Sequence, residues 1–202
     1  MGRRRLSVDD RRDELVAVGQ QLIGTRAWDS VTMADIAAEA KVSKGLLYHY
    51  FSAKPDLYLA AVHAAAKELS EATRPDPALP PRQRLHHALG THLDWIEEHA
   101  VAYRAVLQGG LSGDREVQAI VESSRDEVVS RIARDSGLDE VSPLLRIALK
   151  GWVGFLEGAC LEWLVTKDVP RDDLIRMLAA MITAAIRAAT AAERTSPPAG
   201  ST

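Results

Sequence analysis

The fold is decided by residues 31–54, Val-Thr-Met-Ala-Asp-Ile-Ala-Ala-Glu-Ala-Lys-Val-Ser-Lys-Gly-Leu-Leu-Tyr-His-Tyr-Phe-Ser-Ala-Lys. Two short helical patterns in this stretch are separated by a tight polar turn. Thr32 and Asp35 have the spacing of a capping box at the start of the first pattern, and Ser43 is placed to cap the second. A helix-turn-helix has this arrangement, and it presents its second helix to the major groove of DNA.

The charge of the chain is distributed unevenly. Over all 202 residues, 25 Lys and Arg stand against 28 Asp and Glu, and the net charge of −3 by itself argues against a nucleic-acid binder. Residues 1–56 carry nine basic and eight acidic side chains, so the net negative charge belongs to the remainder. The basic residues gather at the N-terminal arm, the second helix of the motif and the start of the next helix, where small patches suit phosphate contact.

The sequence does not have the marks of a membrane or secreted protein. It has no run of about 18 apolar residues, so we expect no transmembrane span. The N-terminal Met-Gly-Arg-Arg-Arg lacks the apolar segment of a secretory signal. Cys160 is the only cysteine, so an intramolecular disulfide is impossible, and we expect a cytoplasmic protein.

Apolar periodicity and cap residues predict an all-α chain with about nine helices. The expected helices span residues 9–24, 33–39, 44–50, 54–72, 82–98, 101–109, 114–136, 143–166 and 171–193. The four prolines between residues 75 and 81 interrupt any helix and mark a candidate boundary. The tail 195–202, Thr-Ser-Pro-Pro-Ala-Gly-Ser-Thr, has the composition of a disordered segment.

The helix predicted at 44–50 must bury one face. We expect Leu47, Tyr50 and Phe51 to pack against Ile36 and Leu15. Tyr48 and His49 cannot both lie on that face, so they are available to donate to phosphates or to touch base edges. Lys44 offers a cation where the helix begins, and Gly45 permits a close approach of backbone to DNA.

Residues 11–60 resemble the tetracycline-repressor (TetR) family of bacterial regulators. The matching residues are Thr32, Ile36-Ala37, Ala40, Val42-Ser43-Lys44-Gly45, Leu47-Tyr48, Tyr50-Phe51, Lys54 and Leu57. The resemblance implies an all-helical homodimer. It implies a DNA-binding helix-turn-helix domain of three helices, at 1–53, and a helical domain that binds a small molecule and dimerises, at 54–194, with 54–72 as the connector.

The same resemblance implies which positions contact DNA. They are Thr32, Ser43, Lys44, Gly45, Tyr48, His49 and Lys54. Lys54 stands where a phosphate could meet the N-terminus of the next helix. Three positions depart from the family pattern. Lys41 replaces the usual turn glycine, at a cost of roughly 1–2 kcal/mol if it is left-handed; Ala53 replaces a serine-type cap, for which Ser52 could substitute; and Ala27 replaces a common glycine.

The last two predicted helices carry apolar stripes that are wide enough for burial on two sides. One side would face the core of the protomer and the other a partner, so two helices from each protomer would form a four-helix bundle about a two-fold axis. A purely intramolecular core is the alternative. The residues that we expect at the dimer interface are Leu149, Trp152, Leu156, Leu178, Met181, Ile182 and Ile186.

A ligand pocket is expected among the aromatic residues of the C-terminal part. The candidate lining residues are Trp95, Tyr103, Leu107, Trp152, Phe155 and Glu157. Large aromatics beside a lone acid suit an apolar ligand with one polar or cationic group. The alternative is ordinary core, with Glu157 facing solvent or paired with Arg146 or Lys150.

Enzyme, metal and cofactor sites are not indicated. Gly110-Leu111-Ser112-Gly113 superficially resembles a nucleophile elbow, but Asp114 is not the required glycine and no strand precedes it. No Walker or dinucleotide-binding glycine pattern occurs, so we expect no cofactor. Cys160 has an apolar helical setting without a local base. The histidines at 86, 87, 92 and 99 form a loose cluster in which no pair has the spacing i, i+4, so we expect no metal site.

These observations together predict a ligand-responsive DNA-binding transcriptional regulator, and not an enzyme. The expected partners are double-stranded DNA with a near-palindromic operator, a second copy of the chain and a small-molecule effector, without a membrane. We expect a repressor that is released from its operator by a small organic molecule. The alternative is an all-helical ligand-binding or interaction module without DNA-binding activity.

Overall fold

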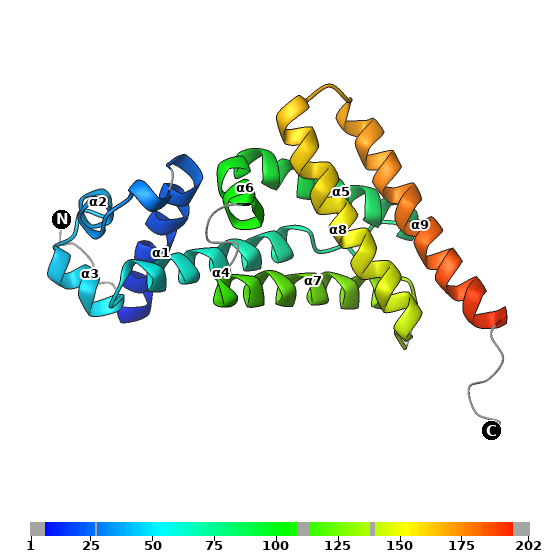
Figure 1. Ribbon diagram of the computed structural model, residues 1–202, viewed down its shortest axis with the longest axis horizontal. Helices are drawn as coiled ribbons and strands as arrows, with labels where there is room; N and C mark the ends of the chain where they lie inside the picture. The colour runs from blue at the N-terminus through cyan, green and yellow to red at the C-terminus, as the bar shows by residue number, and fades with distance from the viewer. Residues whose placement is uncertain (1–6, 27, 109–113, 138–139, 196–202) are drawn as a thin grey trace. The chain divides into compact units, whose positions relative to one another are not determined.

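The computed structural model describes residues 7–26, 28–108, 114–137 and 140–195, in which every regular element is a helix (Figure 1). The helices are α1 (Val8–Thr25), a short 3₁₀ helix η1 (Trp28–Ser30), α2 (Met33–Glu39), α3 (Lys44–Tyr50), α4 (Lys54–Ala72), α5 (Pro81–Glu98), α6 (Ala100–Gln108), α7 (Arg115–Asp135), α8 (Pro143–Thr166) and α9 (Arg171–Thr195). The predicted all-α class is confirmed, and the described α-helices follow the predicted order.

The described residues form two compact units. The first unit comprises the chain up to Leu69 together with Glu98–Val121, and the second comprises Ser70–Glu97 and the chain from Glu122 onward. The division falls within α4 and within α7, so each of these helices contributes residues to both units. The domain boundary predicted at residues 53/54 stays a prediction. The turn at Ala27, the segment 110–113 and the tail 196–202 lie outside the described residues.

The first unit is built on contacts among α1, α2, α3 and α4. Leu15, Ile36, Leu47 and Phe51 are buried in one cluster, which confirms the predicted packing of the 44–50 helix. The helix α1 packs against α6 as well as α2. A Cβ added at Gly19 would lie 3.3–3.4 Å from side-chain atoms of α4, so this glycine permits the close packing of α1 on α4.

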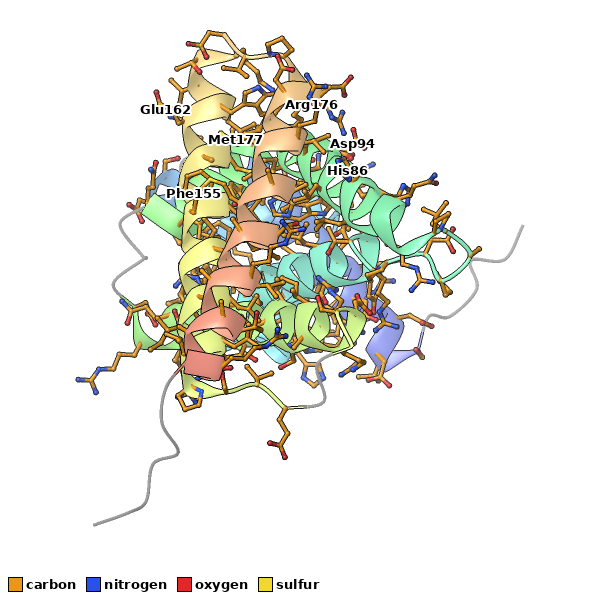
Figure 2. The ribbon with its side chains drawn as sticks, turned by 90° about the vertical axis from the view of Figure 1, so that its right-hand side faces the viewer. His86, Asp94, Phe155, Glu162, Arg176 and Met177 are labelled. Carbon is orange, nitrogen blue, oxygen red and sulfur yellow. The ribbon has the colours of Figure 1, made fainter. Side chains whose placement is uncertain are left out.

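The second unit is built on the pair α8 and α9, which lie side by side in Figure 2. The indole N–H of Trp152 donates to the backbone oxygen of Leu178 at 3.1 Å and joins the two helices. Arg171, at the start of α9, forms an ion pair with Asp94 of α5 at 2.5 Å and donates to the Gly90 oxygen. These interactions connect both helices of the pair to one another and α9 to α5.

The helix α9 is unusually apolar for its burial. Within the described residues, its segment Arg171–Arg194 is long and apolar enough to cross a membrane by length and composition, yet an 18-residue window is only 28% buried. The core helix of a soluble protein passes the same test, so the finding is weak evidence for a membrane. The low burial means that α9 presents much of its apolar surface outside the protomer's own core.

Two non-glycine residues have left-handed backbone conformations. Lys41, in the turn between α2 and α3, has φ 54°, so the condition attached to this position in the sequence is met, and Lys167, after α8, has φ 52°. Their side chains differ in what they contribute. The Lys167 ammonium pairs with Glu97 and lies 3.5 Å from the centre of the Trp163 ring, and no such contact accompanies Lys41 among the residues that the structure describes.

Lys41→Gly should therefore raise the free energy of unfolding by about 1 kcal/mol, because glycine removes the Cβ conflict of the left-handed region at some cost in unfolded-state entropy. Chemical denaturation of both proteins measures it. Lys167→Gly is the matched control: it removes the same backbone strain but loses the ion pair and ring contact, so it should gain less or be destabilised. A Lys41→Gly protein that is no more stable than wild type would contradict the argument.

Candidate nucleic-acid interface

Local hydrogen bonds fix the two helices of the helix-turn-helix. The Thr32 hydroxyl accepts from the Asp35 N–H at 3.2 Å, and the Asp35 carboxylate accepts from the N–H and the hydroxyl of Thr32 at 2.8 and 2.6 Å. These hydrogen bonds lower the pKa of Asp35, and the bond with the Thr32 side chain has the largest effect. Ser43 caps α3 by accepting from the Leu46 N–H at 3.1 Å. Both predicted caps are confirmed, and they determine where α2 and α3 begin.

The outer face of α3 carries the polar residues. Leu47 is completely buried, whereas the side chain of Tyr48 is 51% exposed. Lys44, Gly45 and His49 are exposed as well, and the His49 ring meets the Tyr50 ring edge-on at 5.2 Å. The exposed face therefore combines a cation, a phenol and an imidazole, all of which hydrogen-bond to nucleic acid.

Gly45 is not required by the packing of the first unit. A Cβ at this position would have only the Ser43 hydroxyl oxygen within 4 Å, at 4.0 Å. Its backbone lies in a regular helix, where glycine is unfavourable by roughly 0.5–1 kcal/mol relative to alanine. The absence of a side chain at an exposed helical position leaves room for close approach of another molecule.

One further cation lies beside α3 and was not selected from the sequence. The guanidinium carbon of Arg12, on α1, lies 5.2 Å from the centre of the Phe51 ring, immediately after α3. Arg12 is exposed. Only tertiary packing brings it there, because α1 and α3 are separated by the whole of η1 and α2 and no local pattern in the sequence links them.

At the start of α4, where Ala53 replaces the family's serine-type cap, the Ser52 side chain donates to Asp56 and does not accept from a backbone N–H of the described residues. The Asp56 carboxylate accepts from the Ala53 N–H at 3.0 Å and from the Ser52 hydroxyl at 2.5 Å. Both bonds lower the pKa of Asp56, and the bond from the Ser52 hydroxyl has the larger effect. Lys54 donates from its ammonium to backbone oxygens of the turn before α2, so its DNA contact stays a prediction.

The candidate ligand residues are divided between the units. Tyr103 and Leu107 belong to the first unit, and Trp95, Trp152, Phe155 and Glu157 belong to the second. Trp95, Tyr103 and Trp152 are buried. Phe155 is half-buried on α8, where Figure 2 labels it. Their role in binding stays a prediction.

Glu157 has a partner that the sequence did not indicate. Its two carboxylate oxygens accept from Arg125 of α7, at 2.9 Å from Nε and 2.6 Å from the terminal nitrogen. This fork raises the pKa of Arg125. Lys150, one of the two partners considered from the sequence, instead pairs with Asp126 at 2.7 Å and with Glu122 at 3.4 Å.

The residues expected at the dimer interface are mostly inside the second unit. The buried ones are Leu149, Trp152, Leu156, Leu178 and Ile182. Ile186 is half-buried, and Met181 is 41% exposed. A partner helix could therefore reach Met181 and part of Ile186 from outside, whereas the buried five pack within the protomer.

Side chains that could hold a metal ion are not gathered in the part of the chain that the structure describes. No group of three or more His, Cys, Asp or Glu side chains there could hold a metal ion. Burial, and to a smaller extent the charge of Arg131, lowers the pKa of His92 to about 4, so His92 is neutral at pH 7. Burial raises the pKa of the Cys160 thiol to about 12, so it is not a thiolate nucleophile.

Two sequence profiles match the chain. The family described as "Bacterial regulatory proteins, tetR family" matches residues 15–61, which contain α2 and α3. The "Tetracyclin repressor-like, C-terminal domain" matches residues 81–185, just over half of the chain. The chain belongs to the TetR family. It is a DNA-binding transcriptional regulator, and α3 belongs to the matched DNA-binding region.

Individual relatives agree with this family. The HTH-type transcriptional activator FasR of Mycolicibacterium smegmatis is 32% identical over 174 residues, covering 83% of this chain and 78% of that protein. A TetR-family transcriptional regulator from Streptomyces coelicolor superposes with a TM-score of 0.84 at 28% identity, covering 94% of this chain and 86% of that chain. FadR from Bacillus subtilis, solved with stearoyl-CoA, shares the fold at 14% identity, with a TM-score of 0.64 and coverage of 86% and 97%.

Removing a polar side chain from the outer face of α3 should weaken DNA binding without unfolding the protein. We expect Lys44→Ala and Tyr48→Ala to bind operator more weakly. If Lys44 contacts a phosphate, Lys44→Ala should also lower the slope of log affinity against log salt by about one unit. Fluorescence anisotropy at several salt concentrations measures both quantities. If both variants bind at wild-type strength, α3 is not the recognition helix.

Proposed function

We propose that this chain is a homodimeric repressor that is released from a near-palindromic operator by a small organic effector. Residues 1–53 form the DNA-binding domain and residues 54–194 the effector-binding and dimerisation domain, joined by the helix 54–72. Operator contacts come from Thr32, Ser43, Lys44, Gly45, Tyr48 and His49. The single observation that supports this function best is the exposed polar face of α3 above a completely buried Leu47. The protein acts in the cytoplasm, where bacterial DNA is accessible.

Dimerisation is supported by a seam of small and apolar residues on the outside of α8 and α9. On α8 they are Leu144, Ile147, Gly151, Gly154 and Gly158, which recur at steps of three and four, and Val165, which follows two turns later. On α9 they include Met177, Ala180, Met181, Ala184 and Ala188. All of these residues are exposed, and Figure 2 views this pair of helices with Met177 labelled. Steps of three and four are the pattern of helices that pack against partner helices.

The three glycines of this seam support close contact with another helix. A Cβ added at Gly151, Gly154 or Gly158 would meet nothing within 4 Å in the protomer. Each glycine inside a helix is unfavourable by roughly 0.5–1 kcal/mol relative to alanine, and the protomer's own packing does not use the space. A second copy related by a two-fold axis would use it, and would also cover the exposed apolar side of α9.

A charge on this seam should break the dimer and leave the protomer folded. We expect Met181→Glu to become monomeric, because an uncompensated buried charge costs several kcal/mol. Val101→Glu, an exposed apolar position on α6, is the control and should stay dimeric. Sedimentation equilibrium measures the dissociation constants. Ile182→Glu is less informative, since Ile182 is 2% exposed and a charge there would be buried in the protomer itself.

Gly154→Ala gives a second test in which the two effects have opposite signs. The isolated protomer should gain up to about 1 kcal/mol of helix stability, because alanine is the better helix former. The dimer should nevertheless dissociate more readily if two helices meet closely at this glycine. A Gly154→Ala protein that dimerises as tightly as wild type, or a Met181→Glu dimer, would place the interface elsewhere.

The effector has an apolar part and needs no cationic group. The carboxylate of Glu157 is neutralised by the two bonds from Arg125, which removes the argument for a cation made from the sequence. Aromatic side chains of the second unit, among them Trp95 and Phe155, supply apolar surface. Stearoyl-CoA is the first probe to use, because FadR, a protein of the same fold, is solved with it.

Activation is the second candidate mode of regulation, because the relative FasR is named as an activator. A reporter placed downstream of the bound sequence separates the two modes. For a repressor, deletion of this protein raises transcription and the effector raises it in the wild type. For an activator, deletion lowers transcription. Either result is compatible with DNA binding by α3.

Effector and operator should influence one another reciprocally. To change occupancy, the effector must prefer one arrangement of the two DNA-binding domains, since equal affinity for both shifts nothing. A differential affinity of about 1–3 kcal/mol changes operator affinity by roughly 5–150-fold, and operator must change effector affinity by the same factor. Calorimetric titration with stearoyl-CoA, with and without saturating operator, measures this. Binding that is unaffected by operator would contradict allosteric control.

A further inference from the structure

The ammonium of Lys54 is fully engaged inside the first unit. Its Nζ lies 2.7 Å from the backbone oxygen of Trp28, 2.8 Å from that of Val31 and 3.4 Å from that of Asp29. It also lies 5.2 Å from the centre of the Trp28 ring. An ammonium has three N–H donors and no acceptor, so the three carbonyls use all of its hydrogen-bonding capacity. A DNA phosphate would have to displace them.

The N-terminus of α4 is also engaged. Its Ala53 N–H donates to the Asp56 carboxylate, and Pro55 has no N–H to offer. The bonds from Ser52 and Ala53 lower the pKa of Asp56, so this carboxylate is ionised at pH 7. A negative side chain at the first turn is stabilised by the helix dipole and repels a phosphate. A phosphate at this position would therefore have to displace the carbonyls from the Lys54 side chain and lie close to the Asp56 carboxylate.

The atoms that Lys54 engages belong to the turn immediately before α2. Trp28–Ser30 forms the short helix η1, and Val31 precedes Thr32, the residue that caps α2. The Trp28 ring also packs against the Tyr58 ring of α4, with centres 5.2 Å apart. Lys54 and Tyr58 are one helical turn apart, so the beginning of α4 holds this turn by a charge and by a ring. The helix α3 packs on α2, so a displacement of α2 also displaces α3.

We propose that Lys54 is a positioning residue. It fixes the turn before α2, and with it the recognition helix α3, on the start of α4, and it does not contact a DNA phosphate. This inference rests on the proposed DNA-reading role of α3. Because α4 continues into the second unit from Ser70, the Lys54 tether makes the helix-turn-helix follow any displacement of this helix.

The experiment compares the salt dependence of DNA binding by Lys54→Met, Lys54→Arg and Lys44→Met. Lys44→Met removes the same charge from the exposed face of α3 and is the matched control. The probe is a duplex that the wild-type protein selects from a random-sequence library. Circular dichroism verifies that each variant is folded, and Lys54→Arg carries the test if Lys54→Met does not fold.

We expect Lys54→Met to bind on the order of tenfold more weakly, with the wild-type slope of log affinity against log salt. Lys44→Met should lower that slope by about one unit. Lys54→Arg should also bind weakly, because a planar guanidinium cannot direct its donors to three converging carbonyls. A phosphate contact predicts the reverse: Lys54→Met loses about one unit of slope and Lys54→Arg binds like wild type. That result would overturn the proposal.

Hydrogen exchange without DNA gives an independent readout. Amides of residues 28–34 should exchange faster in both Lys54 variants and at the wild-type rate in Lys44→Met, because the Lys54 bonds to the carbonyls of this turn oppose its local opening. Unchanged exchange in the Lys54 variants would overturn the positioning role. If the wild-type protein selects no duplex, the proposed function fails, and the exchange rates alone still decide the role of Lys54.

Discussion

The DNA-reading surface depends on the burial of one face of α3. A helix of seven residues is not stable in water by itself, so α3 exists because Leu47 and the following Phe51 are packed against α1 and α2. Side chains on a helix repeat every 3.6 residues, so burying this face leaves Gly45, Tyr48 and His49 on the other, while Lys44 is exposed as the first residue of the helix. The same constraint therefore stabilises the helix and exposes the groups that we propose to contact DNA.

The ends of the neighbouring helices reinforce this arrangement. In α1, α2 and α4 an aspartate in the first turn accepts from the backbone N–H three residues earlier, at Asp10, Asp35 and Asp56. The helix α3 differs, since no acidic residue follows its cap Ser43 in the first turn. Negative charge is thus placed at the ends of helices that support the motif and is absent from the first turn of the helix that faces DNA.

In α8 and α9 the buried side and the exposed side of each helix differ in composition. Large apolar residues such as Leu149 and Leu178 are buried inside the second unit, while glycines, alanines and further apolar residues such as Met181 lie on the outside. Exposed apolar side chains and helical glycines are unfavourable for an isolated protomer and become favourable where a partner helix covers them closely. This asymmetry explains how α9 is both highly apolar and only partly buried.

The helices could be predicted from the sequence, because caps, prolines and apolar periodicity are local signals. The bounds of α2, α3, α4 and α8 agree with those predicted, and the departure from the family's turn glycine marked Lys41 as the position where a left-handed backbone would be costly. The short helix η1 and the left-handed Lys167 were not predicted, since three residues carry no periodicity and Lys167 is compensated by Glu97, 70 positions away.

Tertiary packing sets which charged groups remain free to bind another molecule and which side of a wide apolar stripe is buried. Lys54 donates to backbone carbonyls about 25 residues earlier, and Glu157 accepts from Arg125, 32 residues earlier. Within α9, the adjacent Met181 and Ile182 both fit the apolar pattern, yet one is exposed and the other buried. Periodicity defines a stripe along one helix, whereas its buried side is set by the neighbouring helix, and the sequence of one helix does not contain that information.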